Sequence, residues 1–164
     1  GQLQQLSKDH SSVATLVERA LDDSRPLASA AGVNLVLRNE ITQASVYGDA
    51  GRLVQSLNHL LSNALKFSPR GGTVEVSIAR HPAGIRVAVA DQGPGIPEAF
   101  RNRLFQPFSQ ADSTDVDFRG GAGLGLSIAK AIIQQHSGTI GYESMPGRGA
   151  CFYFDLPELD NSSV

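Results

Sequence analysis

The chain has no tryptophan, one cysteine and one methionine among its 164 residues. Because Cys151 stands alone, the chain can form neither an internal disulfide nor a metal site with several cysteine ligands. Its position directly before the aromatic residues Phe152 and Tyr153 predicts a small buried hydrophobe. No run approaches the roughly 18 consecutive apolar residues that a membrane span needs, and no leader-like segment opens the chain. We therefore expect no membrane contact by this piece, whose start at Gly1 suggests a longer parent.

An excess of charge of one sign is missing as well. The 14 basic and 16 acidic residues leave a formal net charge of −2. Such a balance offers no electrostatic footprint for nucleic acid or for an anionic membrane, so we expect neither partner. With 41% hydrophobic residues, a chain of this length is typical of one globular domain with a single core.

Hydrophobic periodicity predicts a mixture of helices and strands without regular βαβ alternation. Residues 93–121 show no strong period, and a stretch of that length inside a domain is usually functional or mobile. We therefore expect an α+β fold, with helices packed on one face of a mostly antiparallel sheet. The expected helices span 12–31, interrupted or kinked at Pro26, 50–67, and 124–138; the expected strands span 33–37, 44–47, 73–79, 85–90, 139–143 and 150–156, with 44–47 pairing 33–37 and 73–79 forming a hairpin with 85–90.

The predicted helix 50–67 carries a polar stripe beside its apolar one. Arg52, Ser56, His59, Asn63 and Lys66 recur at spacings of three and four, which places them on one face. A solvated helix face explains such a stripe without any function. Alternatively, the Asn63 amide oxygen suits Mg²⁺ and the Lys66 ammonium suits a phosphate, provided that a nucleotide binds nearby.

Glycine-rich segments account for most of the remaining chemistry. Asp91 ends an apolar strand and precedes Gly93 and Gly95, so its carboxylate can accept from an exocyclic amine while the glycines let the backbone pass close to a ring. A simple glycine-rich turn remains the alternative. Gly120–Leu126 runs into a helix, where exposed amides form an anion site, although a flexible hinge also fits. Gly147–Gly149 fits a tight β-turn.

Taken in order, five segments closely resemble the boxes of the catalytic ATP-binding domain of sensor histidine kinases. They are Asn63–Phe67 (N box), Asp91–Gly95 (first glycine box), Phe105–Phe108 (F box), Gly121–Leu126 (second glycine box) and Gly147–Gly149 (third glycine box). The resemblance implies a two-layer α/β sandwich of Bergerat type that holds ATP and Mg²⁺ beneath a mobile lid. It also implies domain bounds of 12–158, with 1–11 as the junction to an upstream helical domain and 159–164 as a tail.

The same resemblance implies a role for individual residues. Asn63 would bind Mg²⁺, Lys66 would contact phosphate, and Asp91 would take the adenine amino group. Phe105 and Phe108 would lie in the lid, and Arg119 is a candidate for γ-phosphate contact from its charge and position. The remaining residues expected around ATP are Gly93, Gly95, Ile96, Gly121, Gly123, Leu124, Gly125, Leu126, Gly147 and Gly149.

Two departures from the family pattern affect the expected activity. His59 stands where many members carry Asn and the ATPase branches carry a water-activating Glu, which disfavours hydrolysis. His59 either assists transfer, orders the water around the metal, or is a surface histidine without a catalytic part. In addition, none of His10, His59, His81 and His136 lies in a phosphoacceptor motif, so the accepting histidine is expected in the helical domain.

The expected function is therefore a cytoplasmic protein-histidine kinase fragment in two-component signalling, whose parent can be membrane-anchored. Its partners would be the helical dimerisation and phosphoacceptor domain of the same protein and, downstream, a response-regulator receiver domain. We expect the fragment to be monomeric and the parent homodimeric. The alternatives are an ATPase or protein serine kinase of the same superfamily, or a regulatory docking module that does not respond to nucleotide.

Overall fold

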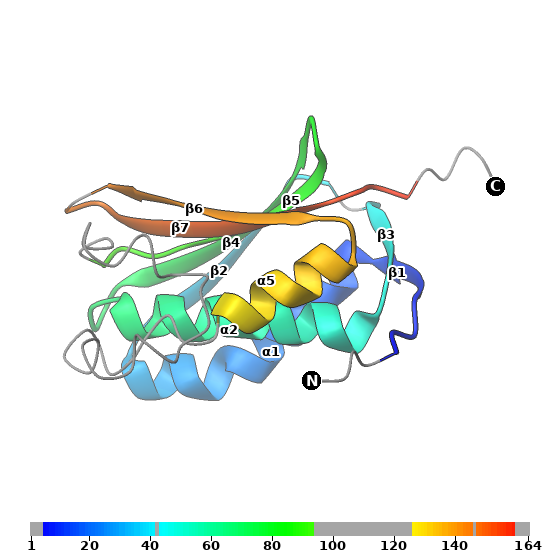
Figure 1. Ribbon diagram of the computed structural model, residues 1–164. Coiled ribbons are helices and arrows are strands. Elements are labelled where there is room, and N and C mark those ends of the chain that lie inside the picture. Colours follow the sequence, from blue (N-terminus) through cyan, green and yellow to red (C-terminus); the bar gives the residue numbers. More distant parts are fainter. Residues whose placement is uncertain (1–4, 42, 94–125, 146, 160–164) are drawn as a thin grey trace.

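The computed structural model describes residues 5–41, 43–93, 126–145 and 147–159. Its helices cover one face of a twisted five-stranded sheet, and a small second sheet lies at one end (Figure 1). The expected α+β layer architecture is confirmed. Its elements are β1 (Asp9–Ser12), α1 (Val13–Ala31), β2 (Asn34–Asn39), β3 (Ser45–Gly48), α2 (Ala50–Phe67), β4 (Thr73–His81), β5 (Gly84–Ala90), α5 (Leu126–Gln135), β6 (Thr139–Met145) and β7 (Gly149–Leu156).

The large sheet has the strand order β2-β4-β5-β7-β6, and only the β2–β4 pair is parallel. The expected hairpin of β4 and β5 is confirmed, with His81 opposite Gly84. Alternate residues of the central strands point toward the helices, and there they form the core with the apolar stripe of α2. Phe152 on β7 and Leu60 on α2 are completely buried in this core.

Helix α1 continues through Pro26, so the helix is not interrupted there, and the alternative expectation of a kink stays a prediction. A proline inside a helix removes one backbone hydrogen bond, and here the buried face of α1 holds the helix together regardless. Ser12 caps the first turn by accepting from the Thr15 N–H. Gly32 ends the helix in the left-handed conformation, with φ of 68°. Helix α1 therefore begins after Ser12 and ends at Gly32, in agreement with the helix expected over 12–31.

The second sheet corrects the expectation for residues 44–47. Strand β3 does not pair with β2; it pairs antiparallel with β1, which places Asp9 opposite Gly48 and Ser12 opposite Ser45. The polar β1 sequence Asp-His-Ser-Ser has no strand signature, and its pairing depends on a segment more than 30 residues away. The C-terminal segment adjoins the same strand, because the Leu159 N–H donates to the Ser45 carbonyl at 2.7 Å.

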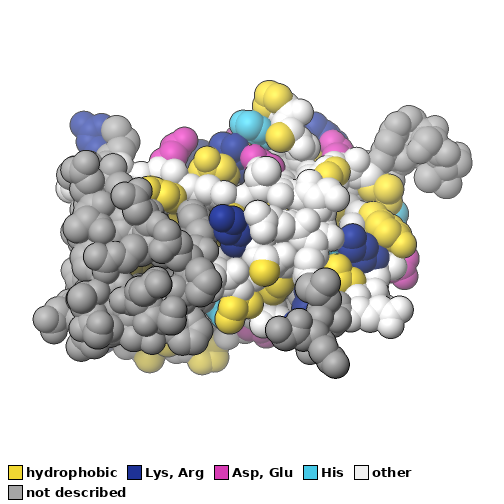
Figure 2. Space-filling view, viewed as in Figure 1, with side chains coloured by type: hydrophobic (Ala, Val, Ile, Leu, Met, Phe, Trp, Pro, Cys, Tyr) yellow, Lys and Arg dark blue, Asp and Glu magenta, His cyan; other side chains and the backbone are white. Residues whose placement is uncertain are grey.

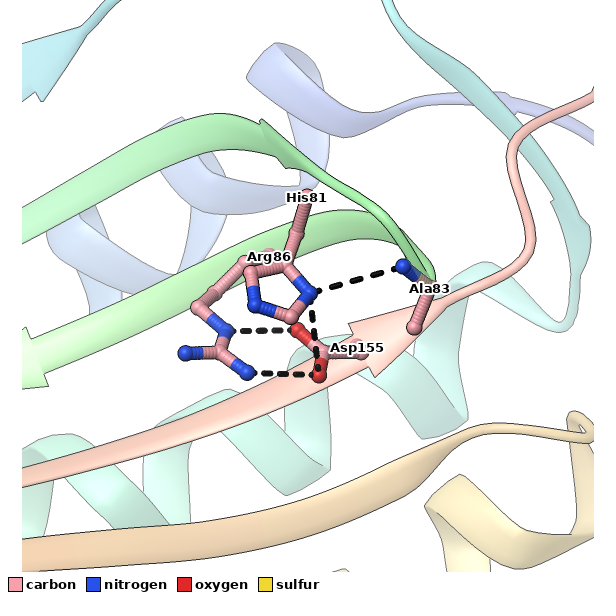
Figure 3. A network of polar contacts seen from close by, with 4 residues as sticks. All are labelled: His81, Ala83, Arg86 and Asp155. Carbon is pink, nitrogen blue, oxygen red and sulfur yellow. Dashed lines mark hydrogen bonds and ion pairs between the residues drawn. The ribbon is translucent and has the colours of Figure 1, made fainter.

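The sheet face that points away from the helices carries polar and small side chains. Arg86 on β5 and Asp155 on β7 form a two-bonded ion pair, with Nε–Oδ1 at 2.7 Å and Nη2–Oδ2 at 2.9 Å (Figure 3). Cys151 also lies on this side, and the small buried hydrophobe expected there is only partly buried. Burial raises the pKa of its thiol to about 11, which keeps the thiol protonated at neutral pH.

The described surface fits the small net charge. On the face shown in Figure 2, basic and acidic side chains are interspersed rather than separated by sign. Among the described residues, no helix is both long enough and apolar enough to cross a bilayer.

Candidate functional site

The polar stripe of helix α2 divides between accessible and buried positions. Asn63 is 4% exposed, His59 is half-buried and Lys66 is exposed. Ser56, in contrast, is completely buried, and its Oγ donates to the Ala129 carbonyl of α5 at 3.2 Å. One residue of the predicted stripe, Ser56, therefore joins α2 to α5. His59, Asn63 and Lys66 remain candidates for ligand contact.

The Asp91 carboxylate, directly after β5, is the most unusual polar group in the described part. Its Oδ1 accepts from the Gly93 N–H at 2.8 Å and from the Ala150 N–H at 3.3 Å. Its Oδ2 is buried and finds no hydrogen-bond partner among the described residues. Burial raises the pKa of Asp91, and the two backbone donors offset that rise only in part. One acceptor atom is thus left for a donor from outside the described residues.

Glycines hold this carboxylate against the end of α2. A Cβ on Gly93 would lie 2.3 Å from the Phe67 carbonyl oxygen, and a Cβ on Gly149 would lie 2.1 Å from the Asp91 carbonyl oxygen. Both positions need a bare backbone, and Gly149 also has φ of 88°. Gly93 therefore brings the segment after β5 into contact with α2. The β6–β7 turn supports Asp91 from its other side through Gly149.

Replacing Gly93 by Ala is expected to destabilise the protein by about 1–3 kcal/mol, because the new methyl group overlaps the backbone of Phe67. Gly51→Ala in the first part of α2 is the matched control, since its Cβ would meet only Asp49 Oδ1 at an ordinary 3.7 Å. There alanine should add up to about 1 kcal/mol through helix propensity. Urea denaturation of both variants measures the difference, and equal stabilities would contradict the close contact.

His59 lies one turn before Asn63 on the same helix. Burial lowers its pKa, so the imidazole is neutral at pH 7. Its Nε2 is buried and has no hydrogen-bond partner in the described ranges. A neutral ring with an unused nitrogen can accept or donate a proton, but it cannot supply a positive charge to phosphate.

Other residues expected around ATP are only partly placed. The side chain of Leu126 is completely buried at the start of α5, so only its backbone can face a ligand. Gly147 has φ of 78° and open space around it, as a tight turn requires. Its expected ATP contact, and that of Gly149, stay predictions. The expected residues that lie outside the described ranges are Gly95, Ile96, Phe105, Phe108, Arg119, Gly121, Gly123, Leu124 and Gly125.

Among the described residues, the oxygen donors suit a magnesium ion that a ligand brings with it. No three His, Cys, Asp or Glu side chains of the described ranges gather at one point. Magnesium in nucleotide sites typically takes one or two protein oxygens and completes its shell with phosphate and water. The buried amide of Asn63 can provide such an oxygen.

A family model described as "Histidine kinase-, DNA gyrase B-, and HSP90-like ATPase" matches residues 48–160. The sensor-like histidine kinase SenX3 of Mycobacterium tuberculosis (strain ATCC 25618 / H37Rv) is 38% identical over 148 residues, covering 90% of this chain and 36% of the relative. The chain spans 17% of the length of sensor protein DivL of Caulobacter vibrioides and 36% of the length of SenX3, so it is much shorter than these relatives.

Two solved structures share the fold over nearly the whole chain. The catalytic domain of histidine kinase ThkA superposes with a TM-score of 0.80 at 25% identity, covering 93% of this chain and 97% of that one. Full-length ShkA, solved in complex with AMPPNP, superposes with a TM-score of 0.79 at 31% identity, covering 94% of this chain and 32% of that one.

Proposed function

The chain belongs to the family of histidine kinase-, DNA gyrase B- and HSP90-like ATPases, and on this premise we propose that it binds Mg-ATP and donates the γ-phosphate to a histidine of a separate helical domain. The curated relatives that it matches include the sensor-like histidine kinase SenX3 and the adaptive-response sensory kinase SasA. The similar ShkA structure contains AMPPNP, an ATP analogue, which supports nucleotide binding by the fold.

The observation that carries the proposal is the unused oxygen of Asp91. A buried carboxylate costs free energy unless its oxygens are paired, and Oδ2 lacks a partner in the described part. The exocyclic amine of adenine would supply that missing donor. Gly93, pressed against the end of α2, allows a flat ring to lie beside the backbone. We therefore assign adenine recognition to Asp91.

The phosphates would then extend along α2. Asn63 would offer its amide oxygen to Mg²⁺, and Lys66 would place its ammonium near a phosphate oxygen. When bound there, Mg²⁺ would neutralise negative charge on the phosphates. The amides of residues 123–125, which precede α5, are proposed to hold phosphate oxygens as helix N-termini do. Since phosphoryl transfer depends mainly on position and charge, these groups suffice for the donor half of a kinase.

His59 favours transfer over hydrolysis. Water attack on phosphate needs a base, and the branches of this family that hydrolyse ATP carry a Glu at this place, which is a better water-activating base than the imidazole of His59. The neutral His59 ring, with its unused Nε2, would instead order water around the metal or relay a proton during transfer. We therefore expect little phosphate release by this chain alone.

The partners follow from the part of the relatives that the chain does not span. We propose that residues 12–158 form the catalytic domain, that 1–11 lead from a helical phosphoacceptor domain, and that a receiver domain accepts the phosphate afterwards. A cytoplasmic location of this piece belongs to the same proposal.

Incubation with radiolabelled Mg-ATP and the upstream helical domain of the same parent tests the transfer. We expect label on the helical domain in an acid-labile, base-stable form, as a phosphohistidine requires, and little free phosphate without that domain. An acid-stable label would indicate a serine kinase. Rapid phosphate release by the chain alone would indicate an ATPase.

A further inference from the structure

A buried histidine outside the proposed site joins α5 to the start of α2. His136 directly follows α5 and is 5% exposed. Its Nδ1 lies 2.8 Å from the Ile132 carbonyl oxygen, and its Nε2 accepts from the Asp49 N–H at 3.0 Å. A carbonyl can only accept and an amide can only donate. The ring must therefore be neutral, with its proton on Nδ1.

The imidazole ring of His136 packs directly against the backbone of Gly48. A Cβ on Gly48 would lie 2.7 Å from Cδ1 of Leu53 and 2.9 Å from Cδ2 of His136, so a larger residue at this position would have to displace one of these side chains. The next residue, Asp49, caps α2 by accepting from the Arg52 N–H at 3.2 Å. Its second carboxylate oxygen accepts from the Ser7 N–H at 3.0 Å. His136 thus holds the residue at which α2 begins.

A second buried contact between α2 and α5 fixes the position of α5 along its own axis. The Ser56 hydroxyl donates to the Ala129 carbonyl at 3.2 Å, about two turns before His136 along α5. Helices α2 and α5 run side by side beneath the sheet (Figure 1). Two contacts at different heights prevent sliding, and a slip by one residue would move the start of α5 by about 1.5 Å.

We propose that His136 is a positioning residue that, as a neutral ring, fixes α5 on α2 and thereby aligns the start of α5 with Asn63 and Lys66, and that its protonation releases this alignment. The link to nucleotide affinity rests on the proposed function. A protonated Nε2 can no longer accept from the Asp49 N–H, so two donors would then face each other.

The charges around the ring come from three directions. Lys8, whose Nζ donates to the Gln135 carbonyl at 2.9 Å, opposes protonation, while the Asp49 carboxylate favours it. His136 and Glu158 both line a cavity of about 200 Å³. The Glu158 carboxylate forms an ion pair with Arg80 at 2.9 Å. Burial is the largest influence and lowers the pKa of His136 from its ordinary 6.5.

A lowered pKa fixes the sign of the pH effect. In the unfolded chain, His136 binds a proton near pH 6.5. In the folded chain, it binds the proton only at lower pH. The stabilisation by the neutral ring is therefore complete above pH 6.5 and is lost as the pH falls from there through the pKa of the folded state. At neutral pH the two helices are held together.

His136→Gln separates the hydrogen bond from the titration. Glutamine can place an amide oxygen near the Nε2 position and cannot take up a proton, so it should keep the alignment and remove its pH dependence. The exposed His10 on β1 provides the control, His10→Gln. His136→Leu removes the acceptor and should weaken Mg-ATP binding about five- to tenfold at pH 7.5, as expected for one lost buried hydrogen bond.

Amide hydrogen exchange of the nucleotide-free protein from pH 5 to 7.5 decides the proposal. Wild type and His10→Gln should lose protection, beyond the intrinsic pH trend, at the Asp49 amide and in α5 at the acid end, whereas His136→Gln should not. Identical pH profiles of wild type and His136→Gln would overturn the positioning role. A parallel titration with Mg-ATP at pH 7.5 tests the proposed function separately, because absent binding would refute that function while the exchange profiles still decide the role of His136.

Discussion

Replacing Asp91 by Asn is expected to weaken ATP binding by about 10–100-fold and, at the same time, to stabilise the nucleotide-free protein. Asparagine keeps an oxygen for the N–H groups of Gly93 and Ala150, which accounts for both bonds to Oδ1. Its amide nitrogen then takes the place of Oδ2. That nitrogen donates, so it cannot receive the adenine amine and instead opposes it.

The opposite sign for stability follows from the buried charge. Burial raises the pKa of Asp91, so the stability linked to this group is complete below its ordinary 3.8 and is lost as the pH rises through the folded-state pKa. Asparagine carries no charge, and the gain from Asp91→Asn should therefore appear at pH 7 and disappear at low pH. Urea denaturation at both pH values and calorimetric titration with ATP measure the two effects.

Asp155→Asn is the matched control, because Asp155 is buried to the same degree but its charge is paired with Arg86. That variant should lose about 1–3 kcal/mol of stability and keep its affinity for ATP. An Asp91→Asn protein that binds ATP within twofold of wild type would remove Asp91 from adenine recognition. A clear loss of stability would instead contradict the account of its buried charge.

Replacing Asn63 by Ala is expected to abolish the magnesium dependence of nucleotide binding and to slow phosphoryl transfer at least about 100-fold, since a metal ion contributes several kcal/mol to charge stabilisation. Asn63 is almost fully buried on α2, and a methyl group offers no oxygen to the ion. The affinity for ATP with Mg²⁺ should fall to the value measured with a chelator. Titrations with and without Mg²⁺ show the change directly.

Asn58→Ala tests whether the loss is specific. Asn58 lies on the same helix, but its Nδ2 donates to Asp23 Oδ2 at 3.2 Å, which joins α2 to α1 away from the proposed site. This variant should bind ATP with unchanged magnesium dependence. If Asn63→Ala keeps its magnesium dependence, another group holds the ion, and the assignment to α2 is wrong.

Local sequence signals predicted the elements that local chemistry controls. The helix expected over 50–67 is α2 with the same bounds, because its apolar stripe is long and Asp49 caps it. Strand β1 escaped prediction because its polar residues carry no alternation, and only its pairing with β3 makes it a strand. The partner of β3 was wrong for the same reason: strand pairing over long sequence separations depends on tertiary structure.

The order of the glycine-rich and N-box segments indicated the family, but not how the site is supported. Spacing alone grouped Ser56 with Asn63, although Ser56 bonds to α5. Two further contacts have no signature in the sequence: that of Gly149 with the Asp91 backbone, and that of the His136 ring with Gly48. Such contacts join residues more than 50 positions apart, and only the folded chain brings them together.

Parallel calorimetric titrations of the wild-type chain with Mg-ATP and Mg-GTP test the central claim most directly. Guanine has a carbonyl oxygen where adenine has its amine, so the unused oxygen of Asp91 would face an acceptor instead of a donor. We predict that GTP binds at least about 100-fold more weakly than ATP. Comparable affinities for the two nucleotides would contradict recognition of adenine by the buried carboxylate.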